Sequence, residues 1–165
     1  MDRKTLMEKK EEIDEDYKRL SGRADTLYQF VMTYADYIHE ARDYGTGEKI
    51  KMVEVHILTM IESQPGVTIS ALAQMWNRTK SAVSQNVKRL EEKKLVYRVQ
   101  DESDGKIFHL YPTQEGTYLS LAHKYFDNRD ILQTQQDLLE LCTMEEIDTF
   151  YKVLKAYQSL FNEPA

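Results

Sequence analysis

Apolar residues recur every three to four positions over most of the chain, and this spacing predicts a mainly helical fold. We expect N-terminal helices over 3–20 and about 27–41, with a break at Ser21-Gly22. The run Asp43-Tyr-Gly-Thr-Gly47 should stop the second helix, because glycine favours turn geometry. A third helix is expected over about 51–63, and its inward side should carry Val53, Ile57, Met60 and Ile61.

Two short helices joined by a tight turn come next. Thr68 is a suitable N-cap for a helix over 69–76, and Thr79 for a helix over 80–93, because a threonine hydroxyl accepts from a free amide of the first turn. The pair Asn77-Arg78 supplies the turn between them. This order predicts a helix-turn-helix.

A hairpin and two more helices complete the pattern. Strand-like runs at 96–99 and 107–111 flank the turn-forming pair Asp104-Gly105. Thr113 should cap a long helix reaching about 141, and the capping box Thr143-Met-Glu-Glu146 should open the last helix. We therefore predict a mainly α fold with a small β-hairpin wing, built as a winged helix-turn-helix lobe on a helical dimerisation body.

The helix over 80–93 has one apolar and one polar side. At 100° per residue, Val83, Val87 and Leu90 form a seam that should be buried. The opposite side is small and polar, so it suits the major groove of DNA, although an ordinary solvated helix face has the same pattern. Its members are Ser81, Gln85 and Lys88, and Ser84 lies on its flank.

Charge is distributed unevenly along the chain. The formal net charge is −6, which by itself argues against a nucleic-acid partner. The segment from Arg78 to Arg98, however, contains seven basic and two acidic residues. Its net charge is therefore +5, and that of the rest of the chain is −11. A basic patch on an acidic body would present one face to a phosphate backbone.

Other classes of protein find little support. No apolar run approaches the roughly 20 residues that cross a bilayer, and the single Cys142 cannot form a disulfide within the chain, so we expect a cytoplasmic protein. No nucleophile elbow, phosphate loop or paired carboxylates suggest catalysis, so we expect neither an enzyme nor a cofactor.

Two stretches carry a family resemblance. Thr68–Arg98 contains the helix-turn-helix with its exit Leu-Glu-Glu-Lys-Lys-Leu-Val, and Asp101–Gly116 contains Asp-x-x-Asp-Gly-Lys followed by Thr-x-x-Gly. In this order and spacing they resemble the MarR family of bacterial regulators. The resemblance implies a homodimeric, sequence-specific regulator of transcription, typically a ligand-responsive repressor, that binds a pseudo-palindromic operator in double-stranded DNA.

The resemblance also implies where DNA would be contacted. The helix 80–93 would enter the major groove, and the wing 98–106 would lie at the minor groove or the backbone. The helices over 1–50 and 113–165 would form the dimerisation body, around a DNA-binding lobe over 51–112. The DNA-binding residues we predict are Arg78, Thr79, Lys80, Ser81, Ser84, Gln85, Lys88, Arg98 and Lys106.

Two positions depart from the family pattern. Lys106 stands where the family usually has arginine, and lysine cannot form a bidentate pair, so docking of the wing is less firmly implied than docking of the helix. Lys94 stands where the family favours glycine, and a left-handed backbone there should cost about 1 kcal/mol.

Several alternatives stay open. A winged helix can bind a protein partner instead of DNA, and binding to duplex at low salt separates the two. An effector pocket could be lined by Tyr34, Tyr37, His56 and Met60, although core packing explains the same residues. His123 and Asp127 are one helical turn apart and could face one ion, but without a metal-binding motif we expect no metal.

Overall fold

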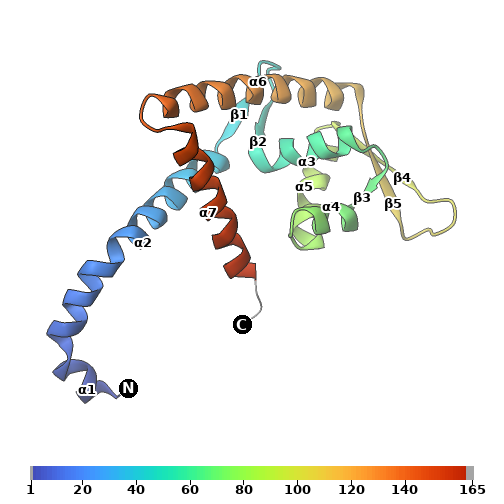
Figure 1. Cartoon of the computed structure of the whole chain (residues 1–165). Coiled ribbons are helices and arrows are strands. Elements are labelled where there is room, and N and C mark those ends of the chain that lie inside the picture. Colours follow the sequence, from blue (N-terminus) through green and yellow to red (C-terminus); the bar gives the residue numbers. More distant parts are fainter. Residues whose placement is uncertain (1, 163–165) are drawn as a thin grey trace.

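The computed structural model describes residues 2–162 as seven helices and five short strands (Figure 1). In chain order they are α1 (Arg3–Glu8), α2 (Lys10–His39), β1 (Ala41–Asp43), β2 (Lys49–Lys51), α3 (Met52–Ser63), β3 (Val67–Thr68), α4 (Ile69–Met75), α5 (Lys80–Glu92), β4 (Val96–Gln100), β5 (Phe108–Pro112), α6 (Gln114–Leu139) and α7 (Met144–Asn162).

The winged lobe lies beneath one end of α6, and α2 and α7 extend from the region of its other end (Figure 1). The lobe combines α3, α4 and α5 with a three-stranded antiparallel sheet in the order β3-β5-β4. Val67 pairs with Leu110, and Val96 pairs with Pro112. The predicted mainly α fold with a β-hairpin wing is confirmed, and β3 adds a third strand that the sequence pattern did not indicate.

The helix α2 runs unbroken through Ser21-Gly22, so the predicted break there is wrong. A glycine inside a helix costs only about 1 kcal/mol relative to alanine, which neighbouring turns can offset. Ion pairs within the helix, such as Lys10 with Asp14 at 2.6 Å, lie on its exposed surface. The helix ends at His39, before the predicted glycine-rich stop.

That stop takes the form of a hairpin, β1–β2. One carboxylate oxygen of Asp43, Oδ1, accepts from the backbone amides of Gly45, Thr46 and Gly47. Gly45 and Gly47 have φ of +87° and +79°, which explains why glycine stands at both positions. The pattern indicated a turn here but not two paired strands.

One hydrophobic core joins the lobe to its neighbours. Besides residues of the lobe itself, it includes Tyr44 and Ile50 from the hairpin segment and Leu119 from α6. Since α3 packs against both α5 and α6, it buries Val55 and Leu58, whereas Val53 is 39% exposed. The single inward stripe expected for α3 is therefore wrong at Val53.

The predicted helix starts are confirmed by their hydrogen bonds. The hydroxyls of Thr68, Thr79 and Thr113 accept from the amides of Ala71, Ala82 and Gly116, respectively. Thr143 and Glu146 form the reciprocal capping box at the start of α7.

Outside the lobe, large apolar side chains lie on the surface. Phe30 of α2 meets Phe150 of α7 edge-on, with ring centroids 6.3 Å apart, yet both are about half exposed. Many further apolar residues of α2, the distal half of α6 and α7 are exposed, including Tyr17, Leu20, Ile131, Leu132, Leu160 and Phe161. Within residues 2–162, no helix has the length and apolar character to cross a membrane.

Candidate nucleic-acid interface

The turn between α4 and α5 fixes the start of the candidate recognition helix. Asn77 has φ of +48°, and the amide of Arg78 donates to the carbonyl of Ala73 at 2.9 Å. Thr79 then caps α5. Asparagine tolerates the left-handed region better than most residues, so the sequence is suited to this sharp reversal.

The predicted seam of α5 is buried: Val83 is 3% exposed, and Val87 and Leu90 are fully buried. This packing turns the polar side of α5 away from the lobe. Ser81, Gln85 and Lys88 are exposed and Ser84 is half-buried, while the start of the helix carries exposed Arg78, Thr79 and Lys80. Seven of the nine predicted DNA-binding residues therefore belong to one helix and the turn before it.

Two other basic residues of α5 and its end, Arg89 and Lys93, form ion pairs with neighbouring elements. Glu54 of α3 is 3% exposed and lies 3.6 Å from a guanidinium nitrogen of Arg89. Lys93, at the end of α5, pairs with Glu48 and donates to the carbonyl of Lys49 at 3.0 Å. These contacts tie α5 to α3 and to the β1–β2 hairpin, and no local pattern in the sequence indicates them.

Arg98 lies on β4 and bridges to α5. Its guanidinium is 2.7 Å from the carboxylate of Glu91, and both side chains are 28% exposed. The carboxylate that pairs with Arg98 therefore comes from α5 and not from the wing that carries Arg98. Arg98 therefore ties the wing to α5. Lys106 is exposed beside the tip.

The wing tip is held by an aspartate–histidine contact. One oxygen of Asp101 accepts from Ser103 and from the amide of Asp104. Its other oxygen is 2.8 Å from Nε2 of His109, whose Nδ1 is 2.7 Å from the carbonyl of Gly66. Both ring nitrogens thus face acceptors, and only the protonated imidazolium can donate to both.

The ionisation of this pair follows from its contacts. The hydrogen bond to Asp101, with a further one to Gly66, raises the pKa of His109 above its ordinary value of 6.5. Hydrogen bonds from Ser103 and His109 hold the pKa of Asp101 well below its usual range. The histidine's contribution is fully present below pH 6.5 and is lost as pH rises through its raised pKa, whereas the aspartate's is lost only at strongly acid pH.

We predict that an NMR titration of the imidazole signals places the midpoint of His109 above pH 6.5. Replacing Asp101 with asparagine removes the carboxylate, so the midpoint of His109 should move down in that variant. A wild-type midpoint at or below 6.5, or one that Asp101→Asn leaves in place, would contradict this arrangement of the wing.

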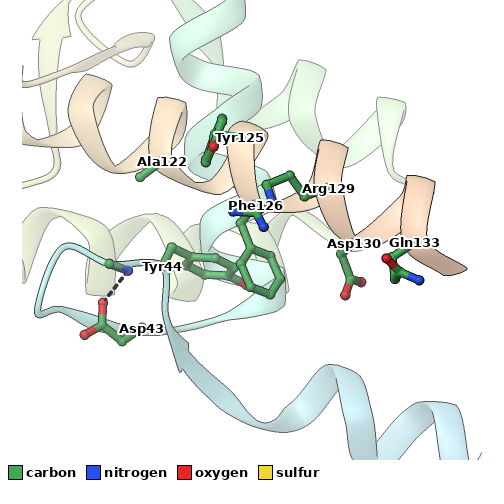
Figure 2. A pocket seen from close by; sticks show the side chains of 9 residues that line it. Asp43, Tyr44, Ala122, Tyr125, Phe126, Arg129, Asp130 and Gln133 are labelled. Carbon is green, nitrogen blue, oxygen red and sulfur yellow. Dashed lines mark hydrogen bonds between the residues drawn. The ribbon is translucent and has the colours of Figure 1, made fainter.

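A cavity of about 540 Å³ lies between the β1–β2 loop and α6 (Figure 2). The ring of Tyr44 stands edge-on to Phe126 at 5.3 Å on one side, and Arg129, Asp130 and Gln133 line it along α6. None of the four residues predicted for an effector pocket lines this cavity.

Those four residues make other contacts. Tyr34 and Tyr37 stack on each other along α2 at 5.9 Å, and Tyr37 also packs under the guanidinium of Arg42. Met60 packs against the lobe core, and His56 faces both Trp76 and His123. Burial lowers the pKa of His123, which is therefore neutral near pH 7. The side chains of His56, His123 and Asp127 lie close enough together to bind one metal ion.

Comparison with known proteins identifies the lobe. Residues 49–107 match the model of the MarR family. Over 87 residues, the chain is 24% identical to YhjH of Bacillus subtilis (strain 168), an uncharacterized HTH-type transcriptional regulator. The match covers 53% of this chain and 50% of YhjH, so the chain spans about half the length of that relative.

Solved structures extend the likeness beyond the lobe. S. aureus MepR in complex with DNA has a TM-score of 0.68 and 25% identity, covering 82% of this chain and 96% of that one. Lactococcus lactis ZitR, a zinc-responsive MarR family member, has a TM-score of 0.66 and 19% identity, covering 87% and 99%. At 19% identity, the second likeness concerns the fold alone. The family model, the fold and the residues of the helix-turn-helix agree: residues 49–107 match the MarR family, and the fold around them is similar to that of a MarR-family regulator solved with DNA.

Proposed function

We propose that the protein is a sequence-specific regulator of transcription that binds double-stranded DNA as a homodimer. The single observation that carries the proposal is the outward side of α5, where exposed Ser81, Gln85 and Lys88 project from a helix whose opposite side is buried. Serine and glutamine can hydrogen-bond base edges, and lysine can reach guanine or phosphate. The role is one of binding and requires no catalytic group.

The start of α5 adds to the proposed interface. Its first amides carry the positive end of the helix dipole, and exposed Arg78 and Lys80 flank them. A phosphate of the backbone would be bound there while the next turns lie against the bases. Lys106 would then reach the backbone or the minor groove from the wing, and Arg98 would fix the angle between wing and helix through Glu91.

The homodimer rests on the exposed apolar faces outside the lobe. No described residue of α2 or α7 is buried within the single chain. Many of their aromatic and aliphatic side chains are exposed to solvent. Large apolar side chains exposed in this number are typical of an interface between subunits. Two lobes on such a body would meet half-sites about one helical turn, roughly 34–36 Å, apart on one face of the duplex.

A change in DNA affinity on binding of an effector is part of the proposal, because α6 connects the lobe to the apolar body. In that arrangement, the protein acts in the cytoplasm as a repressor whose release is controlled by a signal. A winged lobe that recognises a protein partner is the competing function, and it requires no attraction to duplex.

Salt dependence tests the proposal. We predict that the full-length protein binds duplex DNA at low salt, and that the logarithm of the binding constant falls linearly with the logarithm of salt concentration. Lys88→Ala should weaken binding to every sequence and reduce the slope by about 1, because one cation no longer displaces counterions. Fluorescence anisotropy with labelled duplexes measures both.

The matched control is Lys18→Ala, which removes an exposed lysine of α2 far along the chain from the lobe. It should leave affinity and slope unchanged. Failure of the wild type to bind any duplex at low salt would exclude the proposed function, and equal losses in the two variants would exclude α5 as the contact surface.

A further inference from the structure

His123 is a buried histidine with no hydrogen bond. It lies on α6 where that helix packs against α3, and its exposed fraction is 2%. Among the described residues 2–162, neither of its ring nitrogens has a hydrogen-bond partner. Nε2 lies at ion-pair distance from the carboxylate of Asp127, but neither nitrogen forms a hydrogen bond. A buried polar group without a hydrogen bond costs free energy, which a further partner at this position would offset.

Two further donors converge on this histidine. Asp127 follows it by one helical turn on α6, and its Oδ2 is 3.2 Å from Nε2 of His123. His56 comes from α3, with its ring 4.9 Å from that of His123 at 72°. One ligand atom from each of the three residues can be chosen so that all lie within 4.8 Å of one another.

These separations fit a metal ion. Ligand atoms about 2.0–2.1 Å from a tetrahedral ion stand roughly 3.3 Å from each other, close to the separation of His123 and Asp127. His56 would need to approach by a small side-chain movement. A shared ion would bind the lone pair of the buried imidazole, whose ring nitrogens form no hydrogen bond with the described residues.

We propose that His56, His123 and Asp127 bind one divalent transition-metal ion, for which Zn²⁺ is the best match. Two imidazoles and one carboxylate are ligands that zinc prefers, whereas calcium and magnesium favour sites made only of oxygen. Three protein ligands leave a fourth position for water or a further ligand. The site joins a helix of the lobe to the long helix that leaves it.

The surroundings protect the ligands without competing for them. The ring of Tyr44, itself buried, stands edge-on to His123 at 4.9 Å, and Trp76 covers His56 at 6.0 Å. Lys124, which follows His123 on α6, forms an ion pair with Glu62 and not with Asp127. Aromatic walls of this kind limit exchange with solvent around a metal.

The test is a titration of the metal-free, full-length protein with Zn²⁺, followed by NMR of the imidazole rings. The chain has four histidines, so each can be resolved. We expect one equivalent of zinc to shift the signals of His56 and His123 and to leave those of His39 and His109 in place. Mg²⁺ at the same concentration should shift none of them.

A conservative pair of variants checks the third ligand. Asp127→Asn keeps the shape but removes the negative charge, and it should weaken zinc affinity at least tenfold in competition with a chromophoric chelator. Asp137→Asn, an exposed position on the same helix, should bind zinc as the wild type does. Circular dichroism establishes that both variants are folded.

Three results would overturn the proposal: unchanged His56 and His123 signals, zinc bound at His39 or His109 instead, or wild-type affinity in Asp127→Asn. None of these measurements uses DNA. The metal site and the proposed DNA-binding function therefore succeed or fail separately.

Discussion

Replacing Gln85 with alanine is expected to flatten the protein's preference among operator sequences. Gln85 is exposed in the middle of the outward side of α5, where a glutamine amide can form two hydrogen bonds with adenine. Losing such a bidentate contact should cost about 1–3 kcal/mol of discrimination, roughly a five- to 150-fold ratio between right and wrong bases. Affinity for unrelated duplex should change far less, because phosphate contacts dominate it.

Selection from a random duplex pool measures this effect. The wild type and Gln85→Ala are incubated with the pool, and the enriched sequences are counted after each round. We expect one position in each half-site to lose its base preference in the variant. Gln136→Ala, at an exposed position of α6, serves as control and should keep the wild-type preferences. Identical enrichment by Gln85→Ala would refute the assigned contact.

Gly116→Ala is expected to cause the largest loss of stability. A Cβ at this position would stand 2.0 Å from the carbonyl oxygen of Leu95, a backbone atom that also accepts from the amide of Thr113. Neither partner can move without disturbing the start of β4 or of α6. Overpacking of this kind costs about 3 kcal/mol at the upper end of its usual range, and we expect at least that.

The control is Gly22→Ala on α2, where an added methyl group meets nothing within 4 Å. Alanine is the better helix former by roughly 0.5–1 kcal/mol, so this variant should be equal to or more stable than the wild type. Urea unfolding followed by circular dichroism compares the two. Wild-type stability in Gly116→Ala would show that α6 and β4 are not packed this closely.

Local sequence signals were sufficient to predict the helices and caps of the helix-turn-helix. Thr68, Thr79 and Thr113 cap helices where their spacing from apolar runs indicated, and the seam of α5 is buried as predicted. Lys94 has φ of +58°, so it adopts the left-handed conformation that the family's glycine would favour. Each of these features depends on a few neighbouring residues, which is why it can be read directly from the chain.

Contacts between distant segments were not predictable in the same way. The partner of Arg98 on β4 is Glu91 on α5, so the pair joins two different elements and depends on how they pack. His56 reaches His123 only through the packing of α3 on α6. Periodicity also failed at Ser21-Gly22, since a weak helix breaker inside a long amphipathic helix does not end it.

Methylation protection of a selected operator tests most directly whether the outward side of α5 lies in the major groove. Dimethyl sulfate modifies guanine N7, which is exposed in that groove, so a docked helix should shield it. We expect protected guanines in two half-sites about one helical turn apart, with protection lost when Gln85 and Lys88 are both changed to alanine. Tight binding with every guanine N7 still reactive would contradict it.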